Sequence, residues 1–132
     1  MGTSLRRAAL ALGLLAVALP AAQAQVQSGD VVRGRGLFES RCGGCHSVDD
    51  DRVGPALGGV VGRTAGKKAG FAYSAALAAA THVWTPEKLQ AWLTDPEALV
   101  PGQAMGYRLS ETADRRDVVT FLQSLAAGQP AR

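Results

Sequence analysis

The clearest pattern of hydrophobic and polar positions lies near the C-terminal end of the chain. Apolar side chains recur there at intervals of three and four residues: Val118, Phe121, Leu122 and Leu125. This spacing puts them on one face of an amphipathic α-helix. Thr112 or Ser110 is expected to cap this helix at its start, and Gly128 to end it.

A second helix is predicted between two prolines. Thr85 precedes Pro86, and a capping threonine followed by proline at the first helical position is a typical helix start. The apolar positions that follow have helical spacing: Leu89, Trp92 and Leu93. Because Pro96 restricts the backbone of Asp95, the helix is expected to end there.

The rest of the chain mixes short helical segments with long loops. Residues 31–42 are predicted to form a helix with Asp30 as N-cap, and the alanine-rich residues 73–80 a short one. Residues 47–70 hold many glycines and three consecutive aspartates, which is typical of a loop. Val100-Pro101-Gly102 begins another irregular segment. The sequence therefore predicts one all-α domain of helices and Gly-rich loops.

Residues 1–24 have the pattern of a secretory signal peptide. Two adjacent arginines are followed by an apolar stretch and then by Ala22-Gln23-Ala24, a small-residue cleavage pattern. A buried N-terminal helix and a membrane anchor are the alternatives, but about twelve apolar residues are too few to span a bilayer. We expect cleavage after Ala24 and export of a periplasmic domain of residues 25–132, without stable membrane insertion.

The charge of this mature domain is nearly balanced. Arg6 and Arg7 are two of the fourteen basic residues of the chain, so twelve remain against eleven acidic residues. A net charge this small gives no argument for nucleic acid as a partner. A domain of this length buries only a modest core, which a bound cofactor would enlarge.

Cys42-Gly43-Gly44-Cys45-His46 carries the most specific chemistry in the chain. A C-x-x-C-H run is typical of covalent attachment of a c-type haem, in which the thiols hold the porphyrin and the histidine binds the iron as proximal ligand. A thiol–disulfide site, half of a zinc site and chance are the alternatives. No strand-rich pattern flanks the motif, as the first would require. Since His82 is the only other histidine and there is no third cysteine, a four-ligand zinc site is disfavoured.

The landmarks around this motif resemble those of the class I cytochromes c, of the soluble mitochondrial and bacterial type. The resemblance covers residues 29–125 and rests on the order and spacing of Gly34, Phe38, Cys42, Cys45, His46, Gly54-Pro55, Gly62-Arg63, Gly70-Phe71, Tyr73, Trp84, Leu89, Pro96, Pro101-Gly102, Met105 and Phe121-Leu122. It implies the class I cytochrome c fold, with helices and Gly-rich loops wrapped around one covalently attached haem c (heme c) per chain.

The resemblance also implies roles for single residues. Met105 matches the distal axial ligand, and the alternative is an ordinary buried methionine. The carbonyl of Pro55 matches the group that accepts a hydrogen bond from His46 and so fixes its tautomer. Three residues match groups that hydrogen-bond the haem propionates: Arg63, Tyr73 and Trp84. With both His46 and Met105 bound, the iron has no open site, which favours electron transfer over catalysis.

Several positions depart from the family pattern. The positions where the family has lysines carry other residues here: Glu97, Ala98 and Ala104. Arg41 and Arg52 match basic positions, and Gln103 replaces a hydroxyl residue near the methionine sulfur. The lysine ring that guides docking in the family is therefore thin, which weakens the expectation of strongly electrostatic docking.

The expected function is transfer of single electrons between redox proteins, an electron donor and an acceptor, by a monomer that is not itself an enzyme. The alternative is a dedicated electron-transfer cytochrome subunit of a periplasmic dehydrogenase. A haem enzyme or gas sensor with an open iron site is disfavoured by Met105. The sequence names neither the partners nor the pathway.

Overall fold

The computed structural model describes residues 28–126, and the predicted signal peptide of residues 1–24 lies outside them. The described elements are, in chain order, α1 (Val31–Leu37), the π-helical turn η1 (Phe38–Cys42), α2 (Ala75–Ala78), α3 (Pro86–Thr94), α4 (Pro96–Leu99) and α5 (Thr112–Ser124). Within these residues the only β pairing is an isolated antiparallel bridge between Thr64 and Val83. The predicted all-α class is confirmed.

The first helical segment runs to Cys42, as predicted. Asp30 is its N-cap, and its carboxylate accepts a hydrogen bond from the Arg33 N–H at 2.9 Å. From Phe38 the hydrogen bonding widens to the π pattern of η1. A π segment of this kind inserts one residue into a turn and is frequent at functional sites. The helix therefore delivers Cys42 at its end.

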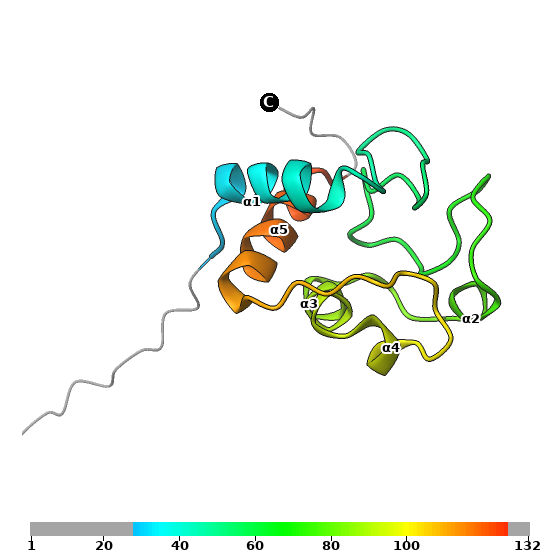
Figure 1. Ribbon diagram of the computed structural model, residues 1–132. Coiled ribbons are helices and arrows are strands. Elements are labelled where there is room, and N and C mark those ends of the chain that lie inside the picture. Colours follow the sequence, from blue (N-terminus) through cyan, green and yellow to red (C-terminus); the bar gives the residue numbers. More distant parts are fainter. Residues whose placement is uncertain (1–27, 127–132) are drawn as a thin grey trace, which may run out of the picture.

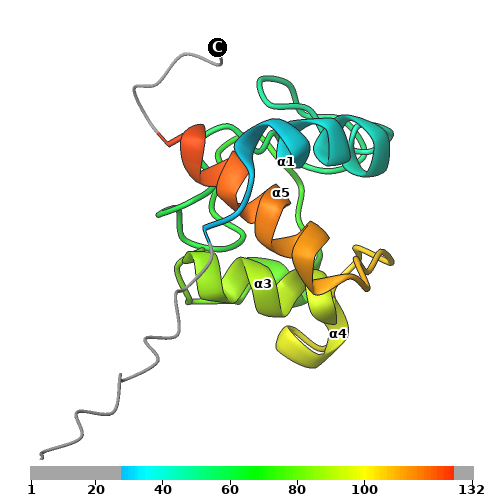
Figure 2. The ribbon, with the colours of Figure 1, turned by 90° about the vertical axis from the view of Figure 1, so that its left-hand side faces the viewer.

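Helix α5 lies between α1 and α3 in both views of the ribbon (Figures 1 and 2). Gly34 lets α1 approach α5 closely, because a Cβ atom at this position would lie 2.5 Å from the carbonyl carbon of Asp117. One turn further, the rings of Phe38 and Phe121 contact each other in a tilted arrangement, with 5.4 Å between their centroids. Three landmarks of the family pattern, Gly34, Phe38 and Phe121, therefore lie where the first and last helices pack together.

Helices α3 and α4 are separated by a single residue, Asp95. Thr85 caps α3 as predicted, and α3 ends before Asp95. The same Asp95 then caps α4, since its carboxylate accepts hydrogen bonds from the N–H groups of Glu97 and Ala98. The Asp95-Pro96 pair predicts only the end of α3, although proline at a first helical position also begins a helix.

Helix α5 buries the predicted apolar face, but its start was predicted wrongly. Val118, Phe121, Leu122 and Leu125 are all buried. The N-cap is Glu111, without a side-chain cap bond, and Thr112 is already helical. The Thr112 hydroxyl instead accepts a hydrogen bond from Arg115 at 2.9 Å. The predicted end at Gly128 lies outside the described residues.

The remaining residues form loops around one side of this helical frame (Figure 1). Residues 43–73 and 100–111 contain no helix, and the predicted helix of residues 73–80 is confined to α2, which Ser74 caps. Among the described residues no helix has the length and apolar character needed to cross a membrane. The helices therefore supply the frame, and the loops close the site.

Candidate functional site

The loops and helices enclose a cavity of about 540 Å³. Residues of η1, α2, α3, α5 and three loops line it. All eight predicted site residues are among them: Cys42, Cys45, His46, Pro55, Arg63, Tyr73, Trp84 and Met105. These residues lie up to 63 positions apart in the sequence, and the tertiary structure brings them together around one cavity.

The C-x-x-C-H motif forms a tight turn at the rim of this cavity. The N–H groups of Cys45 and His46 both donate to the carbonyl of Cys42, at 3.0 and 2.8 Å. Cys42 is half-buried and Cys45 is exposed, and no disulfide joins them. Burial, and next the charge of Cys45, raise the pKa of Cys42 to about 11. The three motif residues that could hold a haem, Cys42, Cys45 and His46, therefore lie together in one turn that lines the cavity.

The imidazole of His46 is fixed on two sides. Its Nδ1 atom lies 2.8 Å from the carbonyl oxygen of Pro55, so Nδ1 carries the proton and Nε2 is free to bind a metal. Gly54 lies against the face of the imidazole ring, and a Cβ atom at this position would be 2.6 Å from Nδ1 and 2.7 Å from Nε2. The Gly54 N–H donates to the Cys45 carbonyl at 2.8 Å. Only glycine leaves room for the ring in this arrangement.

The walls of the cavity are aromatic and aliphatic. Trp84 and Trp92 meet edge to face at 5.2 Å and are both buried. Leu89, Leu93 and Val118 complete this wall and are buried as well. A large apolar group fits a space of this size and lining, whereas a single ion would leave most of it unfilled.

Arg63 and Trp84 are held next to each other by the backbone. The Trp84 N–H donates to the Arg63 carbonyl at 2.9 Å, and the Gly62 N–H donates to the Trp84 carbonyl at 2.9 Å. The Arg63 guanidinium also donates to the Ala56 carbonyl at 3.0 Å. Donors are therefore available at this part of the cavity for acidic groups of a ligand.

Met105 lies in the loop of residues 100–111 and lines the same cavity. It is half-buried, and its N–H donates to the side-chain oxygen of Gln103. No group of three or more His, Cys, Asp or Glu side chains among residues 28–126 could hold a metal ion by itself. A zinc site built from the C-x-x-C pair is therefore absent from the described part of the chain.

His82, the remaining histidine, does not line the cavity. Its ring meets Trp84 edge to face at 4.6 Å, and its Nε2 atom is buried without a hydrogen-bond partner among the described residues. Burial, and next the charge of Lys88, lower the pKa of His82. It is therefore a neutral packing residue behind Trp84.

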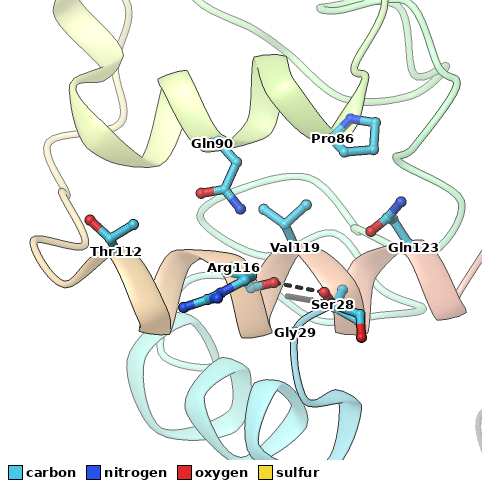
Figure 3. Close-up of a pocket in the computed structure, with 9 residues that line it drawn as sticks. Ser28, Gly29, Pro86, Gln90, Thr112, Arg116, Val119 and Gln123 are labelled. Atoms are coloured by element: carbon cyan, nitrogen blue, oxygen red, sulfur yellow. Dashed lines mark hydrogen bonds between the residues drawn. The ribbon is translucent and has the colours of Figure 1, made fainter. Parts of the chain in front are cut away.

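A second, shallower cavity of about 470 Å³ lies on the other face of α5 (Figure 3). Val118 and Leu122 of α5 face the large cavity, whereas Arg116 and Val119 face this one. Its lining contains no cysteine, histidine, methionine or aromatic residue. The chemistry needed for a haem is therefore confined to the larger cavity.

Sequence reasoning missed two features of the site. Gly54 was noted only as part of a pattern, and its contact with His46 requires the folded loop. Asp51 is one of three consecutive aspartates that predict only a loop. Its carboxylate accepts a hydrogen bond from the Ala56 N–H at 2.8 Å and forms an ion pair with Lys68 at 2.9 Å. The bond from Lys68 is the main reason why the pKa of Asp51 is lowered. No sequence signal separates Asp51 from its neighbours Asp49 and Asp50.

A helical frame around a mostly apolar cavity, with a C-x-x-C-H turn at its rim, is the architecture of a c-type haem protein. Comparisons with known proteins agree. A family model described as cytochrome c matches residues 31–126. Cytochrome c of Euglena viridis is 43% identical over 100 residues, which cover 74% of this chain and 98% of that protein.

Two bacterial relatives extend this result. A cytochrome c-type cyt cy of Rhodobacter capsulatus is 41% identical over 100 residues, which cover 74% of this chain and 50% of that protein. The solved structure of cytochrome cH from Methylobacterium extorquens is similar with a TM-score of 0.69 at 36% identity, over 73% of this chain and 99% of that one. The chain belongs to the cytochrome c family. It is a class I monohaem electron carrier that binds one covalently attached haem c.

Proposed function

We propose that the chain carries single electrons through a haem whose iron is bound by His46 and Met105. The observation that carries this proposal is the single cavity that both residues line, together with the Pro55 bond that leaves Nε2 of His46 available. The bound haem supplies the one-electron chemistry. The residues of this chain would hold it and exclude water with the Trp84–Trp92 wall, and His46 and Met105 would bind its iron.

Each predicted residue has a part in this arrangement. Cys42 and Cys45 would form the thioether links at the rim, and Arg63, Tyr73 and Trp84 would hydrogen-bond the propionates. A neutral thioether on the distal side raises the reduction potential compared with an anionic ligand. With His46 and Met105 bound, no position on the iron would stay open, so this proposal favours electron transfer over catalysis on a bound small molecule.

The test is the ferric spectrum of the purified full chain. Ferric haem bound by methionine has a weak absorption band at long wavelength, which Met105→Ala should abolish while the haem stays covalently bound. A variant that keeps the band would disprove the ligand assignment. A wild-type protein without the band would disprove it as well.

The partners are proposed to be redox proteins that dock at the exposed rim with little electrostatic steering. Among the charged side chains of the described residues, only those of Arg41 and Arg63 join His46 in the cavity lining. Two acidic residues that lie close in sequence to lining residues form ion pairs: Asp51 with Lys68, and Asp95 with Arg108. Apart from Arg41, the exposed residues of the lining are uncharged: Cys45, Val53, Ala72, Ala104, Gly106 and Tyr107. The cavity opening offered to a partner is therefore mostly apolar.

This docking chemistry can be measured without knowing the partners. The rates of electron exchange with an anionic reagent, hexacyanoferrate, and a cationic one, hexaammineruthenium, are compared across ionic strength. Small salt slopes of opposite sign would support the proposal. A steep slope with one reagent would show a strongly charged docking face and contradict it.

We also propose that the chain is exported and works in the periplasm. The support is the arginine pair, apolar stretch and cleavage pattern of residues 1–24. N-terminal sequencing of the protein purified from the periplasmic fraction tests this, and the expected mature protein begins at Gln25. An intact N-terminus in the cytoplasm would contradict it.

The alternative function is a fixed electron-transfer subunit of a periplasmic dehydrogenase. The apolar rim favours it, because stable interfaces are less charged than transient ones at their centre. Gel filtration of a native extract separates the two roles, since a free carrier elutes as a monomer and a subunit with its enzyme.

A further inference from the structure

The loop that carries Met105 has few backbone hydrogen bonds of its own. The Gln103 N–H donates to the Val100 carbonyl at 3.1 Å, and the next such bond in the loop joins Leu109 to Leu93 at 2.9 Å. Between them, residues 104–108 make no backbone-to-backbone hydrogen bond in the described structure. The backbone of this loop therefore does not hold Met105 by itself, and the position of Met105 depends on hydrogen bonds to side chains.

Two side chains connect this loop to α4. One carboxylate oxygen of Glu97 accepts a hydrogen bond from the Gly102 N–H at 2.8 Å, and the other accepts from the Gln103 amide nitrogen at 3.3 Å. The Gln103 amide oxygen accepts from the Met105 N–H. We call these three bonds the Glu97 relay. It links the backbone of Met105 to a helix whose start is fixed by Asp95 and the buried Pro96.

The relay needs this chemistry in this order. Gly102 has a φ of +85°, a left-handed conformation that favours glycine. This turn brings its N–H to Glu97. The Gln103 amide then presents its NH₂ group to the carboxylate and its oxygen to Met105, so each polar group meets a complementary one.

We propose that Glu97 and Gln103 are positioning residues that hold the Met105 sulfur in its place on the distal side of the cavity. The inference rests on the proposed role of Met105 as axial ligand, and it assigns a function to two positions where the sequence departs from the family pattern. The relay replaces a lysine and a hydroxyl residue by a carboxylate and an amide that bind each other.

The direction of each bond predicts the behaviour of isosteric variants. In Glu97→Gln, the new amide can accept from only one of its two donor neighbours, so one bond is lost. In Gln103→Glu, two carboxylates face each other. The double variant Glu97→Gln with Gln103→Glu restores all three bonds, because the amide now stands at position 97 and donates to the carboxylate at position 103.

Helix α3 offers a matched control. Glu87 follows Pro86 and the capping Thr85, as Glu97 follows Pro96 and the capping Asp95. Glu87→Gln therefore removes the same charge from the same helical position without touching the loop. A general effect of charge or of helix stability would appear in both variants.

The experiment uses the full-length ferric holoprotein and imidazole as a competitor for the distal iron site. The wild type is first examined for the long-wavelength methionine band, and Met105→Ala for its loss. Without these two results the ligand assignment fails, and the proposal fails with it. With them, the affinity for imidazole is measured in the two single variants, the double variant and Glu87→Gln.

Losing one hydrogen bond in the relay should raise the affinity for imidazole about fivefold to tenfold. The double variant should return to within about twofold of the wild type, and Glu87→Gln should match the wild type. If Glu97→Gln binds imidazole as the wild type does, or if the double variant is no better than the singles, the relay does not position Met105. This second failure leaves the ligand assignment intact.

Discussion

The two segments that carry the proposed iron ligands, His46 on the proximal side and Met105 on the distal side, are built differently. On the proximal side, His46 lies in a segment that backbone bonds tie together: the Gly54 N–H donates to Cys45, Leu57 to Ser47 and Gly58 to Val48, all at 2.8 to 2.9 Å. On the distal side, Met105 lies in a loop whose middle has no backbone bond in the described structure. Glu97 and Gln103 connect it to α4 instead.

This difference indicates which ligand can leave. Displacing His46 would break its Pro55 bond and disturb a turn that also holds both cysteines. Displacing Met105 requires only that a short loop moves, and loops with few bonds open at low cost. We therefore expect ligand exchange on the distal side, whereas proximal changes should damage the whole holoprotein.

The largest expected effect comes from removing each ligand in turn. His46→Ala should yield little protein with covalent haem, because the motif residue that binds the iron is lost. Met105→Ala should keep the haem attached and open the sixth position. Haem staining after denaturing electrophoresis measures attachment. Equal staining of the two variants would contradict the comparison.

The next effect concerns the glycines of the proximal turn. Gly54→Ala places a Cβ atom against the His46 ring, and overpacking of this kind costs about 1–3 kcal/mol. Gly44→Ala is the control, since its Cβ atom would have no neighbour within 4 Å. Thermal unfolding of the two holoproteins compares them. If Gly44→Ala destabilises the protein as much as Gly54→Ala, the ring contact is not the cause.

The helix pair behind the proximal side gives a third comparison. Gly34→Ala should lower the free energy of unfolding by about 2–3 kcal/mol, because its Cβ atom meets the backbone of Asp117. Gly36→Ala, in the same helix with nothing within 4 Å, should raise it by about 0.5–1 kcal/mol. Denaturant titration measures both. Changes of the same sign would show that α1 is not packed as described.

The smallest effect is the response to acid. Asp117 is 7% exposed, and burial acts to raise its pKa, but hydrogen bonds from the Asp30 N–H and from Arg33 outweigh it. Its pKa therefore lies below its ordinary value of 3.8. The stabilisation is complete above that value and disappears as the pH falls through the lowered pKa.

Asp117→Asn tests this response. The variant should be less stable than the wild type by about 1–2 kcal/mol at neutral pH, with the gap closing in acid as the wild-type carboxyl becomes protonated. Unfolding measured from pH 7 to pH 2 gives both curves. A gap that stays constant with pH would show that the charge of Asp117 does not stabilise the contact between α1 and α5.

Local chemistry determined much of this protein in advance. Asp30 and Thr85 cap their helices through bonds to residues three positions on, so a short stretch of sequence contains the whole interaction. The same holds for the C-x-x-C-H turn and for the apolar face of α5, whose period can be read directly. The eight site residues followed from a family pattern, and the structure gathers them in one cavity.

Only the tertiary structure decided what depends on distant partners. Thr112 is a reasonable cap by residue type, but its hydroxyl bonds to Arg115, and α5 starts at Thr112 after an N-cap, Glu111, that makes no side-chain cap bond. Gly54 matters because the His46 ring packs against it, and Glu97 because a turn at Gly102 returns the chain to α4. A loop adopts one conformation through such contacts, and their spacing has no period that a sequence reveals.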